Sequence, residues 1–357
     1  MSGTLRTRCK RERLSAFGCG KLFDMLFRFL HVAKWKRPLE RETASTQHFS
    51  ASQSHFSCIS ISFIFFEINA RAEMTGEVVK VGFVKLGNIG ASRIVDLVLD
   101  ERADREDVDV RVVGTGAKLT PEHAEATSEL LAWNPDLVVV VSPNAALPGP
   151  KKARELAKER GLPCIVISDA PAKKAVKALK EGGFGYILIM GDPMIGARRE
   201  FLDAVEMSMF NANVLAVLTA TGVVRILQEE LDAVIEQIKK RKAGESVELK
   251  LPQIEVTAEL AAERAGFSNP YAKAKAIAAL AMAEKVADLD VQGCFVVKEA
   301  ERYVPLVAAA HEMLEAAAKL AMEAREIEKY GDSLLRVPHA RTGELLRKVK
   351  LMEKPTA

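Results

Sequence analysis

Short apolar runs alternate with amphipathic stretches from about residue 78 to residue 193. The runs consist mostly of Val, Ile and Leu, which is typical of strands buried on both faces of a parallel sheet. Strands that alternate with helices predict a doubly wound parallel sheet. The predicted strands are residues 78–86, 108–113, 136–142, 164–168 and 186–190, and the predicted helices between them are residues 91–100, 121–132, 151–160 and 172–181.

The pattern becomes helical after residue 197. Residues 247–256 alternate between polar and apolar and are interpreted as a linker or a short strand. The tail at 333–352 has β-like pieces around a turn at 341–343. The fold class is therefore α/β, with a parallel-sheet domain at 74–196, a helix-bundle domain at 197–332 and a small C-terminal β segment at 333–357. The helices predicted in the second domain are residues 198–212, 214–242, 258–265, 270–287 and 298–330.

Residues 1–73 differ in composition from the rest of the chain. They carry 12 Lys and Arg against 6 Asp and Glu, and they hold 9 of the 15 Phe. We interpret them as foreign to the folded part of the chain, either an over-extended reading of the gene with Met74 as the start, or a basic tail or targeting segment. Their apolar run at 59–68 is shorter than the roughly 20 residues of a membrane span, so no membrane partner is predicted.

The overall charge and the cysteines restrict the function further. The net charge of +3 shows no basic excess that would indicate nucleic acid. Cys164 and Cys294 have no metal-ligand spacing and are interpreted as small apolar residues, which fits a reducing cytoplasm. The histidines after Met74 are not paired either, and neither a Gly-x-Ser-x-Gly elbow nor a Walker loop is present. No metal site is predicted, and no catalytic residue is assigned.

The first predicted strand ends in a turn, Gly87-Asn88-Ile89-Gly90. Gly and Asn tolerate positive φ, so the chain can turn sharply here. A strand, a tight turn and a helix N-terminus present backbone N–H groups at the carboxyl edge of a sheet, where anionic ligands bind in open α/β folds. The turn is therefore either part of a ligand site or a plain strand-to-helix connection.

An NAD or NADP site is disfavoured. The turn lacks the three spaced glycines of the G-x-G-x-x-G fingerprint. The second strand ends in Gly114-Thr115-Gly116, without the acidic residue that would bind the ribose.

Polar or turn-forming residues follow every predicted strand, and in a parallel sheet they share one edge. The loop at 142–150 contains Pro143, Pro148 and Pro150, each of which fixes its own φ and restricts the residue before it. A rigid loop of this length is usually functional, so we expect this edge to contact a ligand.

Several long motifs together resemble one family. They are KLGNIGAS, DERADREDVDVRVVGTGAK, SPNAALPGPKKARE, ISDAP, GYILI with DPMIGARREFLDAVEM, NPYAKAKAIAALAMAE, GCFV with ERYVPLVAAAHEM, and LLRVPHA. This set is similar to the coenzyme F-420-dependent methylenetetrahydromethanopterin dehydrogenases of methanogenic and related archaea. The resemblance covers residues 74–357 and none of residues 1–73.

The resemblance implies an oxidoreductase that transfers a hydride reversibly between reduced coenzyme F-420 and methenyl-tetrahydromethanopterin. It also implies a Rossmann-like domain, a helix-bundle domain and a homo-oligomer, a hexamer built as a trimer of dimers. A deazaflavin carrier in place of NAD explains the missing fingerprint. The chemistry leads us to expect carboxylates or carbonyl dipoles near the cationic methenyl group.

The same resemblance gives a hypothesis for the site. The residues expected to line the coenzyme F-420 site are Gly87, Asn88, Gly90, Thr115, Ser142, Pro143, Asn144, Asp169, Ala170 and Pro171. The residues expected to face the pterin substrate are Asp192, Arg198, Arg199 and Glu200, with Asn269, Tyr271 and Lys273 reaching in from the helical domain.

Two other functions remain open from the sequence. One is a non-catalytic α/β protein whose sheet edge captures a phosphorylated ligand, and the other is an NADP-dependent dehydrogenase. A coenzyme F-420-dependent dehydrogenase would bring two ligands together in one cleft, whereas the binding protein would hold one.

Overall fold

The computed structural model describes residues 78–194 and 198–357, so the prediction for residues 1–73 lies outside the described residues. Its centre is a parallel sheet of six strands in the order β2-β1-β3-β4-β5-β6. The five strands predicted from the apolar runs are confirmed, and residues 253–256 form the sixth. The strands are β1 (Val79–Lys85), β2 (Val108–Gly114), β3 (Leu137–Ser142), β4 (Cys164–Asp169), β5 (Gly185–Ile189) and β6 (Gln253–Val256).

Both faces of the sheet are covered, as the apolar strands predict. Successive strand residues point to opposite faces, so Val138 and Val140 belong to one buried cluster and Val139 and Val141 to the other. The first cluster includes side chains of α3 (Thr127–Leu131), α4 (Pro148–Glu159) and α5 (Val176–Gly182). The second includes side chains of α6 (Ala204–Thr221) and α7 (Val223–Lys242). The α/β fold class is therefore confirmed.

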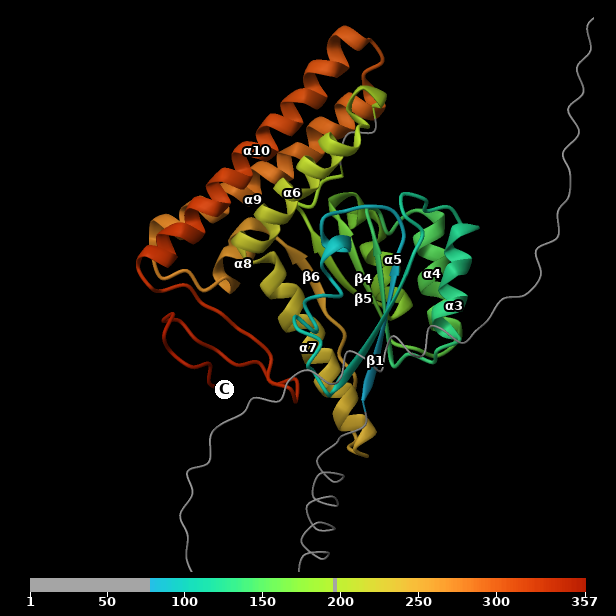
Figure 1. The fold of residues 1–357 in the computed structure, drawn as a ribbon. Helices are drawn as coiled ribbons and strands as arrows, with labels where there is room; N and C mark the ends of the chain where they lie inside the picture. The colour runs from blue at the N-terminus through green and yellow to red at the C-terminus, as the bar shows by residue number, and fades with distance from the viewer. Residues whose placement is uncertain (1–77, 195–197) are drawn as a thin grey trace, which may run out of the picture. The chain divides into compact units, whose positions relative to one another are not determined.

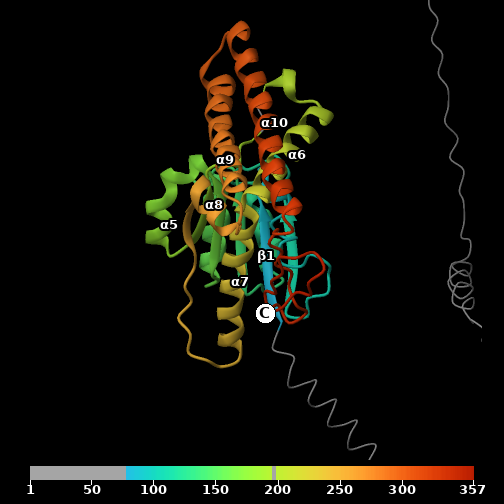
Figure 2. The same ribbon diagram turned by 90° about the vertical axis from the view of Figure 1, so that its left-hand side faces the viewer.

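The long helices α6, α9 (Pro270–Val291) and α10 (Ala300–Tyr330) lie side by side on one side of the sheet (Figures 1 and 2). The short helix α8 (Ala258–Arg264) leads into α9. Their apolar side chains continue the same buried cluster that covers the sheet, and β6 comes from residues 247–256, which were interpreted as a linker or a short strand. One continuous apolar layer therefore joins the sheet to these helices, and the domain division at residue 196 stays a prediction.

Several predicted helices are shorter or differently divided. The helix predicted at 91–100 is only a short 3-10 helix, η1 (Ala91–Arg93), followed by turns. The predicted helices at 121–132 and 172–181 each begin with a 3-10 segment, η2 (His123–Ala126) and η3 (Ala170–Ala175). The helix predicted to start at 198 begins only at Ala204, after a short 3-10 helix, η4 (Arg199–Phe201). Helix α9 continues beyond its predicted end at 287 into a π-helical turn, η5 (Gln292–Val296).

The break predicted near residue 213 is also wrong. Helix α6 continues to Thr221, and the chain bends by 67° at Gly222 before α7. Gly222 has φ +110°, a conformation that L-residues with a side chain rarely adopt. The backbone, not the local hydrophobic pattern, decides this boundary. Among the described residues, no single helix is long and apolar enough to cross a membrane; α6 and α7 meet that criterion only as this bent pair.

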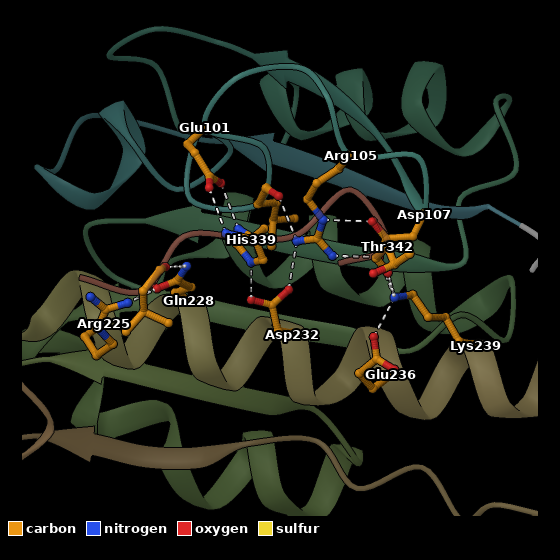
Figure 3. A network of polar contacts seen from close by, with 12 residues as sticks. Glu101, Arg105, Asp107, Arg225, Gln228, Asp232, Glu236, Lys239, His339 and Thr342 are labelled. Atoms are coloured by element: carbon orange, nitrogen blue, oxygen red, sulfur yellow. Dashed lines mark hydrogen bonds and ion pairs between the residues drawn. The ribbon is translucent and has the colours of Figure 1, made fainter. Parts of the chain in front are cut away.

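The C-terminal segment after α10 forms antiparallel bridges, as predicted for the tail. A buried polar network fixes it against α7 (Figure 3). His339 lies between Glu101 and Asp232, with Nδ1 2.8 Å from Glu101 and Nε2 2.7 Å from Asp232. Arg105 donates to Asp232 at 2.9 Å and to both oxygens of Asp107.

Candidate functional site

The turn after β1 is held by a carboxylate from a distant part of the chain. Asp192, which follows β5, accepts hydrogen bonds from the backbone N–H groups of Gly90 at 2.5 Å and Ala91 at 2.8 Å. Its side chain is fully buried, and burial raises its pKa to about 7. The N–H groups that could bind an anionic ligand are thus already occupied by the protein. The Asp192 side chain therefore stabilises the turn, and its predicted role at the pterin stays a prediction.

A cavity of about 380 Å³ opens at the carboxyl edge of the sheet. The loops after β3 and β4 form one wall, and the C-terminal end of α9 with η5 forms the other. Apolar side chains dominate the lining, as in sites for flat organic ligands. The lining residues are Leu119, Pro143, Asn144, Leu147, Asp169, Pro171, Met194, Ala287, Asp290, Val291, Cys294 and Phe295.

Two of the lining residues are buried carboxylic acids from opposite walls. Asp169, which ends β4, accepts a hydrogen bond from the backbone N–H of Ala170 at 2.6 Å. Its burial, and then the neighbouring charge of Asp192, hold its pKa well above the usual range. Asp290 on α9 is 7% exposed, and neither carboxyl oxygen has a hydrogen-bond partner among the described residues. Burial raises its pKa to about 7.

The loop after β3 is braced by hydrogen bonds. The Ser168 hydroxyl donates to the backbone carbonyl of Ser142 at 2.7 Å and accepts from the N–H of Ala145 at 3.0 Å. The Asn144 side chain accepts from the N–H of Ala146 at 3.0 Å. These bonds fix the loop whose Pro143 and Asn144 line the cavity; their predicted contact with coenzyme F-420 stays a prediction. Ser142 itself is fully buried and supports the loop without lining the cavity.

The remaining residues predicted for the cofactor lie around this cavity rather than in its lining. Gly87, with φ +81°, packs so closely on Leu119 and Pro143 that a Cβ atom there would lie 3.0 Å from each side chain. Asn88 accepts a hydrogen bond from Arg93 at 3.2 Å. The Thr115 hydroxyl bonds to backbone carbonyls of its own turn and of β1. Of this group, Gly87 has a direct packing role in the cavity wall.

Arg198 and Glu200 fasten the segment before α6 to the opposite wall. Arg198 donates to the carbonyls of Gly293 at 2.9 Å and Val297 at 2.6 Å, and its guanidinium stacks 3.9 Å from the Tyr303 ring centroid. The Tyr303 hydroxyl donates to Glu200 at 2.9 Å. Arg198 therefore supports the π-helical turn that carries Cys294 and Phe295, whereas Glu200 is bonded to α10. Arg199 is exposed and does not line the cavity.

The structure does not bring Asn269, Tyr271 and Lys273 to this site. Asn269 is the N-cap of α9 and accepts from the N–H of Tyr271 at 2.8 Å. The cavity lies toward the other end of this 22-residue helix, roughly 20–30 Å away along its axis. The N-cap accounts for the motif without a ligand, and the contact of these residues with the substrate stays a prediction.

The sequence reading missed the wall that α9 and η5 supply. Asp290 carried a usable signal, because it follows the buried positions Ala283 and Val286 at helical spacing and so interrupts an apolar face. Phe295 is 59% exposed beside the cavity, and nothing in the sequence around it distinguished it from the other aromatic residues. Within residues 78–194 and 198–357, no group of three His, Cys, Asp or Glu side chains could hold a metal ion.

Comparison with known proteins gives a consistent result. Residues 79–356 match the family model described as methylene-5,6,7,8-tetrahydromethanopterin dehydrogenase. The F420-dependent methylenetetrahydromethanopterin dehydrogenase of Archaeoglobus fulgidus is 61% identical over 278 residues, which is 78% of this chain and 99% of the relative. The enzyme of the same name from Methanothermobacter thermautotrophicus is 52% identical over 279 residues, again 78% of this chain and 99% of the relative.

A solved structure agrees with these relatives. It is described as F420 dependent methylene-tetrahydromethanopterin dehydrogenase in complex with methylene-tetrahydromethanopterin and coenzyme F420. It superposes with a TM-score of 0.74 at 51% identity, and the match covers 78% of this chain and 99% of that one. The resemblance noted in the sequence is thereby confirmed, and the chain belongs to the methylene-5,6,7,8-tetrahydromethanopterin dehydrogenase family.

Proposed function

We infer that this chain is an oxidoreductase that transfers a hydride reversibly between reduced coenzyme F-420 and methenyl-tetrahydromethanopterin, which yields methylene-tetrahydromethanopterin. The observation that carries this inference is family membership over residues 79–356, with a solved relative that holds both ligands in one complex. A non-catalytic binding protein or an NADP-dependent dehydrogenase is not favoured, because relatives across the same length are named for the coenzyme F-420 reaction.

The cavity at the sheet edge has the chemistry that a flat deazaflavin or pterin ring requires. Its walls are mainly apolar, and its few polar groups come from Asn144, Asp169, Asp290 and Cys294. Its volume of about 380 Å³ lies in the range of small-molecule pockets. We propose that the rings meet here, between the loops after β3 and β4 and the wall from α9 and η5.

The protein's contribution to the reaction is mainly positional. Coenzyme F-420, when bound, supplies the hydride chemistry. The loop after β3 and the π-helical turn, both braced by hydrogen bonds, hold the cavity walls rigid and exclude water. Orientation of two reactants in this way can contribute roughly 7–11 kcal/mol to lowering the barrier.

The buried carboxyl groups are suited to the charge of the substrate. The methenyl group is a delocalised cation, and a carboxylate fixed nearby in a water-poor cavity stabilises positive charge strongly. Asp169 and Asp290 stand on opposite walls. Burial raises the pKa of both groups, and we propose that they ionise when the cationic pterin binds between them and then supply the negative potential around it. We also propose that Pro143, Asn144 and Pro171 contact coenzyme F-420.

The oligomer is a further proposal. We propose the hexamer, a trimer of dimers, that the family resemblance implies. Exposed apolar side chains on α6 and η5, such as Val205 at 70%, Met209 at 58% and Val296 at 55%, support burial of this surface between subunits. Light scattering on the purified chain tests the mass, and a monomer at micromolar concentration contradicts the proposal. The cytoplasmic location expected from the cysteines stays a prediction.

The test of the reaction is the visible absorbance of oxidised coenzyme F-420 under anaerobic conditions. With the purified full chain and methylene-tetrahydromethanopterin, we expect bleaching that requires both the protein and the pterin. NAD and NADP in place of coenzyme F-420 give no change. Absence of bleaching by a folded protein refutes the proposed function and leaves the binding-protein alternative.

Two variants test the site assignment. Asn144→Ala removes a polar group from the cavity and is expected to raise the KM for coenzyme F-420 by roughly tenfold, the effect of one lost hydrogen bond. Asn88→Ala, outside the lining, is expected to change KM less. Unchanged kinetics in both variants contradict the placement of the cofactor at this edge.

A further inference from the structure

A second and larger hollow lies away from the sheet edge. It is a groove of about 630 Å³ between α7, α10, the turns after η1 and the C-terminal segment, and it shares no lining residue with the cavity described above. Its floor is apolar, and Leu97 on that floor is 58% exposed. The apolar lining residues are Ile94, Leu97, Val98, Val224, Leu335, Val337, Pro338 and Pro355.

Two arginines from different helices line this groove. Arg225 on α7 and Arg325 on α10 line both the groove and a smaller adjoining hollow of about 120 Å³. Arg225 bonds to the side chain of Gln228, with which it is drawn in Figure 3, and makes no ion pair with any of the described residues. Arg325 has neither a hydrogen bond from its side chain nor an ion pair within the described part of the chain.

Two more cations line the groove from the C-terminal segment. Arg336 donates to the backbone carbonyls of Leu334 and Val349, each at 3.1 Å. Lys348 donates to the carbonyls of Leu351 at 2.8 Å and Glu353 at 3.1 Å. These bonds orient the side chains, and neither cation forms an ion pair with a carboxylate in the described part of the chain.

The negative charge available in the groove is already in use. Among the described residues, Glu101 is the one acidic residue in its lining, and both its oxygens contact His339. Glu328, which lines the smaller hollow, accepts hydrogen bonds from Ser268, Asn269 and Ser333. With four cations and one carboxylate, the groove has a net formal charge of +3.

The cost of burying Arg225 favours an anion in this groove. Burial lowers the pKa of Arg225, Glu229 partly offsets this effect, and the positive charge of Arg347 acts in the same direction as burial. A cation that is partly withdrawn from water is stabilised by a negative charge placed beside it. An anion bound at Arg225 would supply that charge.

We propose that this groove binds a small phosphorylated organic molecule, with the phosphate between Arg225 and Arg325 and the apolar body on the floor. Guanidinium groups match phosphate because their planar N–H donors bind its oxygens in pairs. Arg336 and Lys348 extend the positive rim, and the apolar floor supplies area for an organic body rather than for a bare ion. The site lies apart from the hydride-transfer cavity and goes beyond the proposed function.

The experiment is calorimetric titration of the full chain, in dilute chloride buffer, with phenyl phosphate, inorganic phosphate and phenol as separate probes. Phenyl phosphate is expected to bind more tightly than inorganic phosphate by roughly tenfold, because the ring covers the apolar floor. Phenol, which lacks the charge, is expected to bind at least tenfold more weakly than phenyl phosphate. Affinity for phenyl phosphate should fall steeply between low and physiological salt.

Variants assign the binding to this groove. Arg325→Gln alters an exposed side chain, so folding is expected to be unaffected. The variant is expected to lower the affinity for phenyl phosphate roughly tenfold or more, the effect of a lost charge-assisted hydrogen bond. Arg225→Gln should weaken it similarly. Arg160→Gln, an exposed arginine outside the groove, is the matched control and should bind like the unmutated chain.

Three results overturn the proposal. If phenyl phosphate does not bind the unmutated chain, or binds Arg325→Gln and Arg160→Gln equally well, the proposed site is refuted. Equal affinity for phenyl phosphate and inorganic phosphate shows that the groove binds a simple anion and does not recognise an organic body. A change of oligomeric mass in Arg325→Gln, with phenyl phosphate binding unchanged, shows that the groove receives a second copy of the chain instead.

Discussion

Replacing Asp290 by Asn should stabilise the chain, and by more at high pH. Burial raises the pKa of Asp290 from an ordinary value near 3.8 to about 7. In the unfolded chain the carboxyl ionises near pH 4, so between pH 4 and pH 7 the folded state binds the extra proton and stability falls as the pH rises. At about 1.4 kcal/mol for each pH unit, the loss reaches roughly 4 kcal/mol above pH 7.

The pH dependence separates this effect from any change in packing. At pH 5 the ionisation of Asp290 has lowered the free energy of unfolding by only roughly 1.7 kcal/mol, and by pH 8 this decrease is nearly complete. The free energy of unfolding of Asp290→Asn relative to the unmutated chain should therefore increase by roughly 2–3 kcal/mol from pH 5 to pH 8. Asn differs little in volume from Asp, so its packing contribution is the same at both values.

The assay is urea-induced unfolding at pH 5 and pH 8, followed by circular dichroism at one fixed protein concentration. Asp109→Asn, which changes an exposed carboxylate on β2, is the matched control and should show no such increase. A gain in stability that is equal at the two pH values, or a loss at pH 8, would refute the reasoning. Because a group this unfavourable persists in the cavity wall, we expect the stabilised variant to transfer hydride more slowly.

Two further predictions concern contacts between distant segments. Arg105→Met should destabilise the chain by roughly 3–5 kcal/mol, because the Arg105 side chain is 1% exposed and its loss leaves Asp107 and Asp232 without their shared cation. Urea unfolding measures this effect, with Arg102→Met, which breaks an exposed ion pair, as the control. Equal losses of stability in the two variants contradict the prediction. Gly90→Ala should lower the stability of the fold by roughly 1–3 kcal/mol and reduce activity, because its Cβ would lie 2.3 Å from Val214 and 2.6 Å from Asp192. Gly114→Ala is the control, because its Cβ would meet nothing closer than 3.9 Å. Thermal unfolding that is alike in the two variants contradicts the prediction.

Much of the sheet could be predicted from the sequence, because its signal is local. Continuous apolar runs such as 137–142 are buried on both faces wherever the chain takes them, and the alternation with helices leaves a parallel sheet as the simple solution. The edge that carries Pro143, Asn144, Asp169 and Pro171 followed from the same argument, since loops after parallel strands share one edge.

Only the tertiary structure decided how the other wall and the turn are built. Asp192 meets Gly90 across 102 residues, and nothing near either residue in the sequence encodes that contact. Asp290 reaches the cavity because α9 is long enough to carry it there, whereas the more conspicuous Asn269 stays at the far end of the same helix. Hydrophobic periodicity specifies which face of an element is buried, but the partner of that face depends on packing against segments far away in the chain.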